Sequence, residues 1–379
     1  MIPSLIRGDE TVVTRGIRYE VVARDPELVK PALCRLWCEN LALRVTPEVH
    51  FQRLYRDAPE TSSTVFLLRA DPAEPADGSE IVGCNGYSIR RFQLGAGHDA
   101  RAGISGDLVV ARAHRTLLPA LRLVRAVLDH MVGELAFCYG FPNPKAEGVM
   151  VRAGFRVLGT TTRYARVLRH ATYLPQLAAR APRFVGSTAR HRYLGRVLAP
   201  VVDIVRLAGR APQLARACAD YRIEWLDRAD VRFDQLWDRA RPEYDVIGAR
   251  TAAMLSWRYP RCAIAALVRR ADRALVAYAI IEPDPASGAA HVRDVFGHKP
   301  ALGPLFDLLL PTLWRRGAIS VSVRLLGAPY LVAVLVERGF EPRSEHRTVV
   351  VQIGRDHEAA RARLEDAAAW HLLDLDEDT

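Results

Sequence analysis

The sequence contains very little lysine. Arginine therefore supplies most of its 53 basic residues and of its formal net charge of +10; the only lysines are Lys30, Lys145 and Lys299. A bias in the coding DNA is enough to explain such a composition. The basic excess is concentrated in residues 165–220, with ten arginines against two aspartates, and no nucleic-acid recognition motif accompanies it. This distribution argues against a nucleic-acid-binding protein.

Long apolar runs and paired cysteines are also missing. No stretch reaches the roughly 18 uncharged apolar residues that a membrane-spanning helix needs, and the closest, 194–208, contains three charged side chains. The first ten residues lack the basic flank and apolar core of an export signal. Only Cys34 and Cys38 of the six cysteines lie close together, without a second pair to complete a zinc site. We expect a cytoplasmic protein with reduced, mostly buried thiols and no metal ion.

The 379 residues, 50% of them hydrophobic, are enough for two or three folded domains. Residues 17–168 predict a strand, two helices, three strands, a helix, a strand, a short helix and closing strands. The first two helices begin at Asp25-Pro26 and Thr46-Pro47, which combine an N-cap with a first-turn proline. The other main elements are expected as strands at 17–23, 64–69, 81–91, 103–110 and 136–139 and a helix at 119–132.

The same order recurs in the second half. The expected elements are strands at 221–226, 263–269, 275–281, 289–296, 319–323 and 348–353 and helices at 231–239, 251–257 and 305–315. A strand aspartate precedes a Gly-Phe turn by 47 positions in the first half (Asp107, Gly154) and by 45 in the second (Asp294, Gly339). We interpret this recurrence as a duplication. The fold class that follows is α+β, with two tandem α/β repeats that each form a mixed, mostly antiparallel, splayed sheet flanked by helices.

Four segments follow from this division. They are a first domain at 1–168, a basic helical linker at 169–220, a second domain at 221–355 and an acidic tail at 356–379. The linker is either a solvated segment or a landing surface for an anionic partner, an acidic acyl carrier protein or membrane headgroups. The tail has eight acidic residues against two arginines, and we expect it to lie on a basic surface of the same molecule.

Short motifs of the first half carry a family resemblance. They are Asp107-Leu108-Val109-Val110, His114-Arg115-Thr116-Leu117-Leu118-Pro119-Ala120, Tyr139-Gly140-Phe141-Pro142-Asn143 and Ala153-Gly154-Phe155. In sequence and spacing they resemble the GNAT (GCN5-related N-acetyltransferase) superfamily of acyl-CoA-dependent N-acyltransferases, and the whole chain looks like a tandem-repeat member. The resemblance covers roughly 17–168 and, more weakly, 221–353.

The resemblance implies an acyl-CoA donor, acetyl-CoA or a longer one, bound by a loop that starts at Arg115. The donor-binding positions that it implies are Val109, Val110, Arg112, Arg115, Leu117, Leu118, Ala120 and Asn143. Free backbone N–H groups at a helix start also attract a pyrophosphate on purely physical grounds. Ala120 lets the phosphate approach, whereas Leu118 stands where the family has its central glycine.

The family's reaction is direct attack of an amine on a thioester, which needs a base for the amine proton and an acid for the thiolate. Asp107 is our first candidate for the base, with Glu39 and His114 as further catalytic candidates and Glu147 behind them. A structural role for Asp107, capping a turn or pairing with an arginine, is the alternative. The tyrosine that many members use as the acid is replaced by Met150, and by Leu335 in the second half.

Three functions remain open from the sequence. The first is an acyl-CoA-dependent N-acyltransferase acting on an amine of a small molecule or sugar precursor, with its donor site in the first repeat. The second uses an acyl carrier protein as donor, and the third is a non-catalytic binding protein. The segment 255–259, Leu-Ser-Trp-Arg-Tyr, is either an aromatic and cationic wall for the acceptor or a packing cluster.

Overall fold

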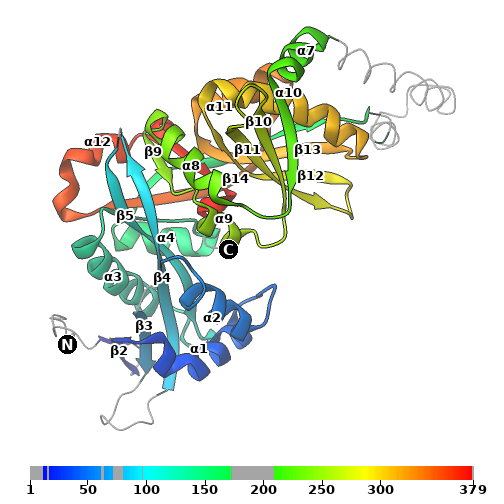
Figure 1. The fold of residues 1–379 in the computed structure, drawn as a ribbon. Coiled ribbons are helices and arrows are strands. Elements are labelled where there is room, and N and C mark those ends of the chain that lie inside the picture. The colour runs from blue at the N-terminus through cyan, green and yellow to red at the C-terminus, as the bar shows by residue number, and fades with distance from the viewer. Residues whose placement is uncertain are drawn as a thin grey trace, which may run out of the picture.

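The structure is a computed structural model, and it describes residues 12–14, 17–60, 64–70, 80–95, 97–170, 172 and 209–377. It is an α+β protein whose two halves lie at opposite ends of one long sheet (Figure 1). In the described part of the chain, no helix is long and apolar enough to cross a membrane.

The first half runs from blue to teal in Figure 1. Its elements are β1 (Val12–Thr14), β2 (Ile17–Arg24), α1 (Pro26–Asn40), α2 (Pro47–Tyr55), β3 (Val65–Ala70), β4 (Glu80–Leu94), β5 (Asp99–Val110), η1 (Arg112–His114), α3 (Leu117–Glu134), β6 (Phe137–Gly140), α4 (Pro144–Ala153) and β7 (Arg156–Val167).

The second half runs from green to red. Its elements are α7 (Ala211–Asp220), β8 (Tyr221–Leu226), α8 (Val231–Ala240), η2 (Arg241–Glu243), β9 (Val246–Gly248), α9 (Ala252–Arg258), β10 (Ala263–Arg269), β11 (Leu275–Asp284), β12 (Ala289–Gly297), α10 (Lys299–Arg315), β13 (Ser320–Gly327), α11 (Pro329–Glu337) and β14 (Glu341–Ile353). The tail adds η3 (Arg355–Ala360), α12 (Arg361–Leu364), η4 (Ala367–Ala369), β15 (Trp370–Leu373) and η5 (Asp374–Asp376).

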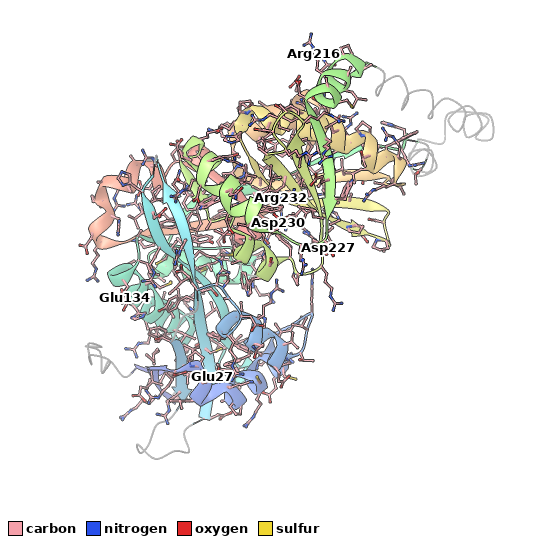
Figure 2. The ribbon with its side chains drawn as sticks, viewed as in Figure 1. Glu27, Glu134, Arg216, Asp227, Asp230 and Arg232 are labelled. Carbon is pink, nitrogen blue, oxygen red and sulfur yellow. The ribbon has the colours of Figure 1, made fainter. Side chains whose placement is uncertain are left out.

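Side-chain caps fix where several helices begin. The Asp25 side chain accepts a hydrogen bond from the N–H of Glu27 at the start of α1, and Thr46 caps α2 in the same way, as the sequence predicts. Asp230 caps α8 through the N–H of Arg232, whose guanidinium returns to the same carboxylate (Figure 2). Helix α3, by contrast, begins without a side-chain cap.

The closing strands of the two halves pair with one another and with strands of the opposite half. β14, from the second half, pairs with β6 and with β7, and β7, from the first half, pairs with β13. The expectation of two separate splayed sheets is therefore wrong. The strand order is β1-β2-β3-β4-β5-β6-β14-β7-β13-β12-β11-β10-β8, one sheet through both halves.

Two short strands that the sequence did not predict close the middle of this sheet into a ring. β9 pairs with β4 and β15, and β15 pairs in turn with β13. The ring is β4-β5-β6-β14-β7-β13-β15-β9, which returns to β4. A hydrophobic core drawn from all of these strands is centred on aromatic side chains, in which Trp370 lies 5.3 Å from Phe137 and 5.9 Å from Phe92 between ring centroids. Both halves thus share one central barrel.

The acidic tail is part of this core. Asp374 bridges Arg293 and Arg324, Asp376 binds Arg250, and Glu377 lies within salt-bridge distance of Arg324. The expectation that the tail meets basic residues of its own chain holds, but these carboxylates are buried rather than laid on a surface.

Candidate functional site

A gap opens in the first half between β5 and β6. The two strands pair in parallel only from Ala102 to Ile104. Beyond Ile104, β5 continues to Val110 paired with β4 on one edge, and no described strand pairs with its other edge. This splayed end exposes backbone groups of β5 to whatever lies in the gap.

The helix that begins beside this gap, α3, is uncapped. Its N-cap residue Thr116 makes no side-chain cap bond, and the buried Thr116 hydroxyl has no partner. Among the described residues, no acceptor meets the N–H groups of Leu117 and Leu118, whereas Pro119 has no N–H. The side chains of Leu117 and Leu118 are 48% and 38% exposed, so this first turn lies at the surface of the protein. The start of α3 therefore offers two free amides and the positive end of the helix dipole to an anion.

The other predicted donor-site residues lie around the end of β5 and the start of α3. Val109 and Val110 are buried at the end of β5, Ala120 is partly buried in the first turn of α3, and Arg112 is exposed in η1. The Arg115 guanidinium donates to the carbonyl of Val110 (2.9 Å) and to Oδ1 of Asn40 (3.1 Å), which fixes the loop against α1.

Asn143 lies after β6 rather than in this loop. Its side-chain oxygen accepts the N–H groups of Lys145 and Ala146, both at 3.0 Å, and so caps α4. The cap leaves only its side-chain NH₂ group available to another molecule.

Asp107 occupies a bulge at the splayed end of β5. Asp107 and Leu108 together oppose Asn85 of β4, and Asp107 has a φ of 55°, which few residues other than glycine adopt. Its Oδ1 lies 2.8 Å from Nε2 of His50 on α2, and both side chains are mostly buried. Because a carboxylate accepts, Nε2 of His50 carries the proton, and Oδ2 of Asp107 is left for another partner.

The surroundings of this pair are aromatic. His50 packs edge-on against Trp37 of α1, with ring centroids 5.1 Å apart, and Tyr55 of α2 stacks on Trp37 with centroids 6.4 Å apart. Burial, and then the charge of Asp107, raise the pKa of Tyr55 well above its usual value. A Cβ on Gly86 would lie 2.3 Å from the Tyr55 hydroxyl, so this position of β4 requires glycine.

The remaining catalytic candidates do not join Asp107. His114 bonds the hydroxyl of Tyr19 on β2 at 3.0 Å, Glu39 is exposed on α1, and Glu147 accepts from Thr348 of β14. Met150 is buried in the core of the first half.

In the second half the corresponding gap is filled. β12 and β13 pair only up to Val292 and Val323, and β15 then lies along β13. His371 of β15 donates from Nε2 to the carbonyl of Val295 on β12 at 2.8 Å. The chain itself thus occupies the space between the two strands.

The start of α10 is filled as well. The N–H of Lys299 donates to Oε2 of Glu243 at 2.7 Å, and the other carboxylate oxygen meets Nδ1 of His298. Asp294, which matches Asp107 in the sequence spacing, is fully buried and binds Tyr278 and Arg250. The second half therefore places a carboxylate of its own where the first half leaves free amides.

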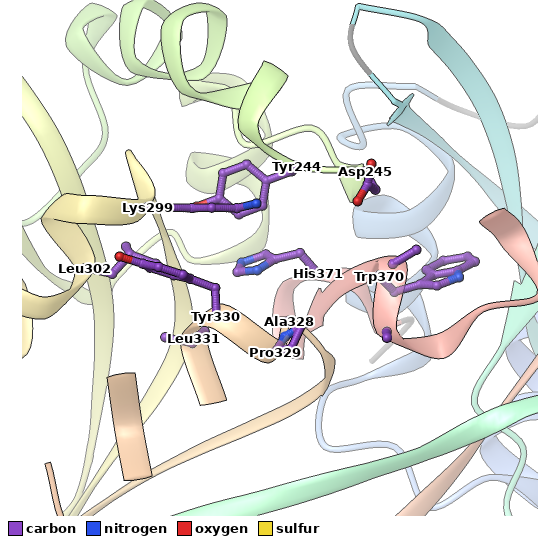
Figure 3. A pocket seen from close by; sticks show the side chains of 12 residues that line it. Tyr244, Asp245, Lys299, Leu302, Ala328, Pro329, Tyr330, Leu331, Trp370 and His371 are labelled. Carbon is purple, nitrogen blue, oxygen red and sulfur yellow. The ribbon is translucent and has the colours of Figure 1, made fainter. Parts of the chain in front are cut away.

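A pocket remains beside this filled gap (Figure 3). The rings of His371, Tyr244 and Tyr330 and the chain of Lys299 surround it, and the starts of α10 and α11 form its wall. The described residues contain no cluster of three or more His, Cys, Asp or Glu side chains suited to a metal ion.

Sequence reasoning missed two residues that shape the candidate site and its filled equivalent, His50 and Glu243. The predicted helix at Thr46-Pro47 carried His50, but no pattern in the sequence shows that this helix meets β5. Glu243 follows Pro242 in a turn, where an acidic residue is ordinarily solvated. The basic segment proposed as a docking surface lies mostly outside the described residues, at 171 and 173–208.

Comparison with known proteins identifies the fold. No family model and no curated protein matches the sequence. A GCN5-related N-acetyltransferase from Anabaena variabilis ATCC 29413 has a TM-score of 0.59 at 10% identity, covering 89% of this chain and 74% of its own. A probable N-acyltransferase from Enterococcus faecalis V583 has a TM-score of 0.58 at 10% identity, with 89% and 73% covered. A GCN5-related N-acetyltransferase from Kribbella flavida has a TM-score of 0.53 at 12% identity, with 88% and 71% covered.

These similarities extend over most of the chain. The protein therefore has the GNAT fold, as its sequence motifs suggested. At such low sequence identity the likeness concerns the fold, and the activity has to be argued from the site.

Proposed function

We propose that the protein is an acyl-CoA-dependent N-acyltransferase, with acetyl-CoA as its simplest donor, and that the donor binds only in the first half. The observation that carries this proposal is the contrast between α3 and α10. Helix α3 begins with unsatisfied amides at Leu117 and Leu118. At the start of α10, by contrast, Glu243 already accepts the N–H of Lys299. A pyrophosphate at α10 would meet a carboxylate, and one at α3 meets N–H groups and a helix dipole.

The open edge of β5 supports the same assignment. A donor whose pyrophosphate lies at α3 extends its arm along the β5 edge beyond Ile104, where backbone groups have no strand partner. An N–H on that edge is suited to polarise the thioester carbonyl, because a fixed backbone dipole stabilises developing negative charge.

Asp107 is placed to act as the base. Oδ2 of Asp107 takes the proton of the attacking amine, directly or through one water, while His50 holds the carboxylate through Oδ1. The amine nitrogen forms its bond to the acyl carbon, the carbon–sulfur bond breaks, and the thiolate leaving group takes up a proton. Since Met150 replaces the tyrosine expected from the family, water is the proton source that we assign.

The matching order of elements suggests how the second half came to differ. We propose that the two halves are tandem repeats that exchange their last strands, and that the second has become a structural and acceptor-binding unit. Its gap holds β15 instead of a donor.

Two substitutions at the N-cap residue Thr116 test the donor site, because they differ from each other in charge but hardly in shape. Thr116→Asp puts a carboxylate at the start of α3, as Glu243 does at α10, and Thr116→Asn is a cap of nearly the same size without charge. Calorimetry with acetyl-CoA is expected to show at least a tenfold weaker affinity for Thr116→Asp and a smaller change for Thr116→Asn. Equal affinities for wild type and Thr116→Asp would show that the donor does not bind at the start of α3. No binding of acetyl-CoA to wild type at millimolar concentration would overturn the proposal.

A further inference from the structure

Three arginines meet around one tryptophan where the two halves adjoin α2. The Arg90 guanidinium of β4 lies 4.7 Å from the ring centroid of Trp257 on α9, and that of Arg53 on α2 lies 5.8 Å from it. The Trp257 indole N–H donates to the carbonyl of Arg53 at 2.9 Å, and Arg53 donates to the carbonyl of Arg258 at 3.0 Å. We call Arg53, Arg90, Trp257 and Arg258 the arginine cluster.

Two arginines of this cluster, Arg53 and Arg258, have no carboxylate partner within salt-bridge distance among the described residues. Arg258 is 7% exposed, its Nε is buried without a partner, and its Nη2 donates only to the backbone carbonyl of Asp374.

Asp374, whose backbone carbonyl accepts from Arg258, has its carboxylate already paired. The side chain of Asp374 binds Arg293 and Arg324. Burial, and then the charge of Arg258, lower the pKa of Arg53. Buried like charges without counter-ions cost free energy, so an anion bound here would relieve that cost.

Donor groups of Arg53 remain available for such an anion. Arg53 lies over the Trp257 ring, and the N–H edge of a guanidinium matches the two oxygens of a carboxylate or phosphate. Arg53 spends one of its five N–H groups on Arg258. Trp257 itself is partly exposed, so the cluster is not sealed within the core.

The cluster lies one helical turn from His50, the residue that holds the proposed base Asp107. His50 and Arg53 are three residues apart on α2, which puts their Cβ atoms about 5 to 6 Å apart on one face of the helix. On β4, Gly86 contacts Tyr55 of α2, Arg90 contacts Trp257, and Ser88 between them is partly exposed. A small molecule held by Arg53 would place a group a few bonds away beside Asp107.

We infer that the acceptor is a small amine that also carries an oxyanion, a carboxylate or a phosphate, which the arginine cluster binds while the amine faces Asp107. This inference rests on the proposed function, and it assigns to the second half the specificity of the reaction through Trp257 and Arg258. It also selects the acceptor-wall interpretation of residues 255–259 over packing alone.

The first test measures anion binding without turnover. Sulfate is titrated at constant ionic strength into wild type, Arg53→Gln and Arg56→Gln, followed by calorimetry. Arg56 ends the same helix but pairs with Glu27 on the surface, so it is the matched control. We expect sulfate to bind wild type and Arg56→Gln alike and at least tenfold more weakly to Arg53→Gln. Equal binding to wild type and Arg53→Gln overturns the inference, whatever the enzyme's activity.

The second test measures specificity with acetyl-CoA, by release of free CoA. The acceptors are ω-amino acids against n-alkylamines of the same length, and glucosamine 6-phosphate against glucosamine. We expect kcat/KM to favour the anionic member by at least tenfold, in the carboxylate or the phosphate arm, and this preference to disappear in Arg53→Gln with the neutral amine unaffected.

The outcomes of the second test separate the two proposals. Neutral amines that react as well as anionic ones in wild type would sink the inference and leave the acyltransferase proposal standing. If no amine releases CoA and acetyl-CoA does not bind, the proposed function fails, while the sulfate titration still decides whether the cluster is an anion site.

Discussion

His50 and Asp107 lie 57 residues apart in the sequence, and their side chains meet at 2.8 Å where β5 bulges. The histidine comes from α2 and the aspartate from the splayed strand, so the pair exists only after α2 has docked on the sheet. One carboxylate oxygen is held and the other is left available. Because His50 fixes the orientation of the carboxylate, the available oxygen is held in one direction, as a general base requires.

Asp107→Asn tests this role. The substitution keeps the shape of the side chain and removes its ability to take a proton, so we expect kcat to fall by about 10²- to 10⁴-fold with acetyl-CoA affinity unchanged. Asp129→Asn, an exposed position on α3, is the control and is expected to leave the rate unchanged. A rate within threefold of wild type for Asp107→Asn would assign the aspartate to structure alone.

His50 is a positioning residue and predicts a graded response. His50→Gln retains an N–H donor for Oδ1 of Asp107, and His50→Ala does not. We expect His50→Gln to keep most of the rate and His50→Ala to lose at least tenfold in kcat, with KM for acetyl-CoA unchanged. Steady-state kinetics of the two variants side by side distinguish this from a merely steric effect, which would harm both equally.

The pairing of the closing strands across the two halves predicts how the molecule behaves when divided. β14 contributes pairing to both β6 and β7, so residues 1–170 alone would expose the edges of two strands. We expect this fragment to aggregate when produced alone and to form a soluble 1:1 complex when co-produced with residues 209–379. Size-exclusion chromatography measures this directly. A monomeric, cooperatively folded fragment 1–170 would show that the first half does not depend on β14.

The sequence was informative about elements and uninformative about their partners. The sequence pattern predicted β8 and β10 to the residue, because the signals for a single strand are local. Whether β7 pairs within its own half or with β13 depends on contacts across the chain, which no pattern encodes. β15 was missed because its acidic neighbours resemble a solvated tail, and their arginine partners are distant in the sequence.

In the candidate site, too, local features were predictable and contacts between distant elements were not. The free amides at Leu117 and Leu118 followed from family spacing and a helix start, and Asp107 from its place on a strand. His50 and the arginine cluster needed the tertiary structure, since each depends on side chains of different elements meeting. The partners of Arg53, for example, come from the other half of the chain.

Trp370 is the residue through which the tail stabilises both halves. Its side chain is 1% exposed and packs on Phe92, Phe137 and Tyr139. Trp370→Ala is expected to lower the free energy of unfolding by about 3 to 5 kcal/mol. His357→Ala, an exposed position in the same tail, is expected to change it by less than about 0.5 kcal/mol. Urea unfolding measures both, and equal stabilities would show that the tail is not part of the core.

His371 predicts a dependence of stability on pH. Burial, and then the charge of Arg250, lower its pKa to about 3. In the unfolded chain a histidine has a pKa near 6.5. Between about pH 6.5 and 3 the unfolded state therefore binds a proton that the folded state does not bind. The contribution of His371 is therefore fully present above about pH 6.5 and is lost as the pH falls towards 3.

Asp294 acts in the opposite direction over part of this range. Burial raises its pKa to about 6, so the folded state holds a proton that the unfolded chain releases above about pH 4, and the stability from this group is lost as the pH rises towards 6. The two effects oppose each other in wild type. A comparison between variants is needed to separate them.

His371→Gln keeps an N–H that can donate to the carbonyl of Val295 and removes the titration. Between pH 7.5 and pH 5, we expect wild type to lose about 2 kcal/mol more of its unfolding free energy than His371→Gln does. Urea unfolding of both proteins at the two pH values measures this difference. An equal loss in the two proteins would mean that His371 is protonated in the folded state, and β15 would then not bury a neutral imidazole in the gap of the second half.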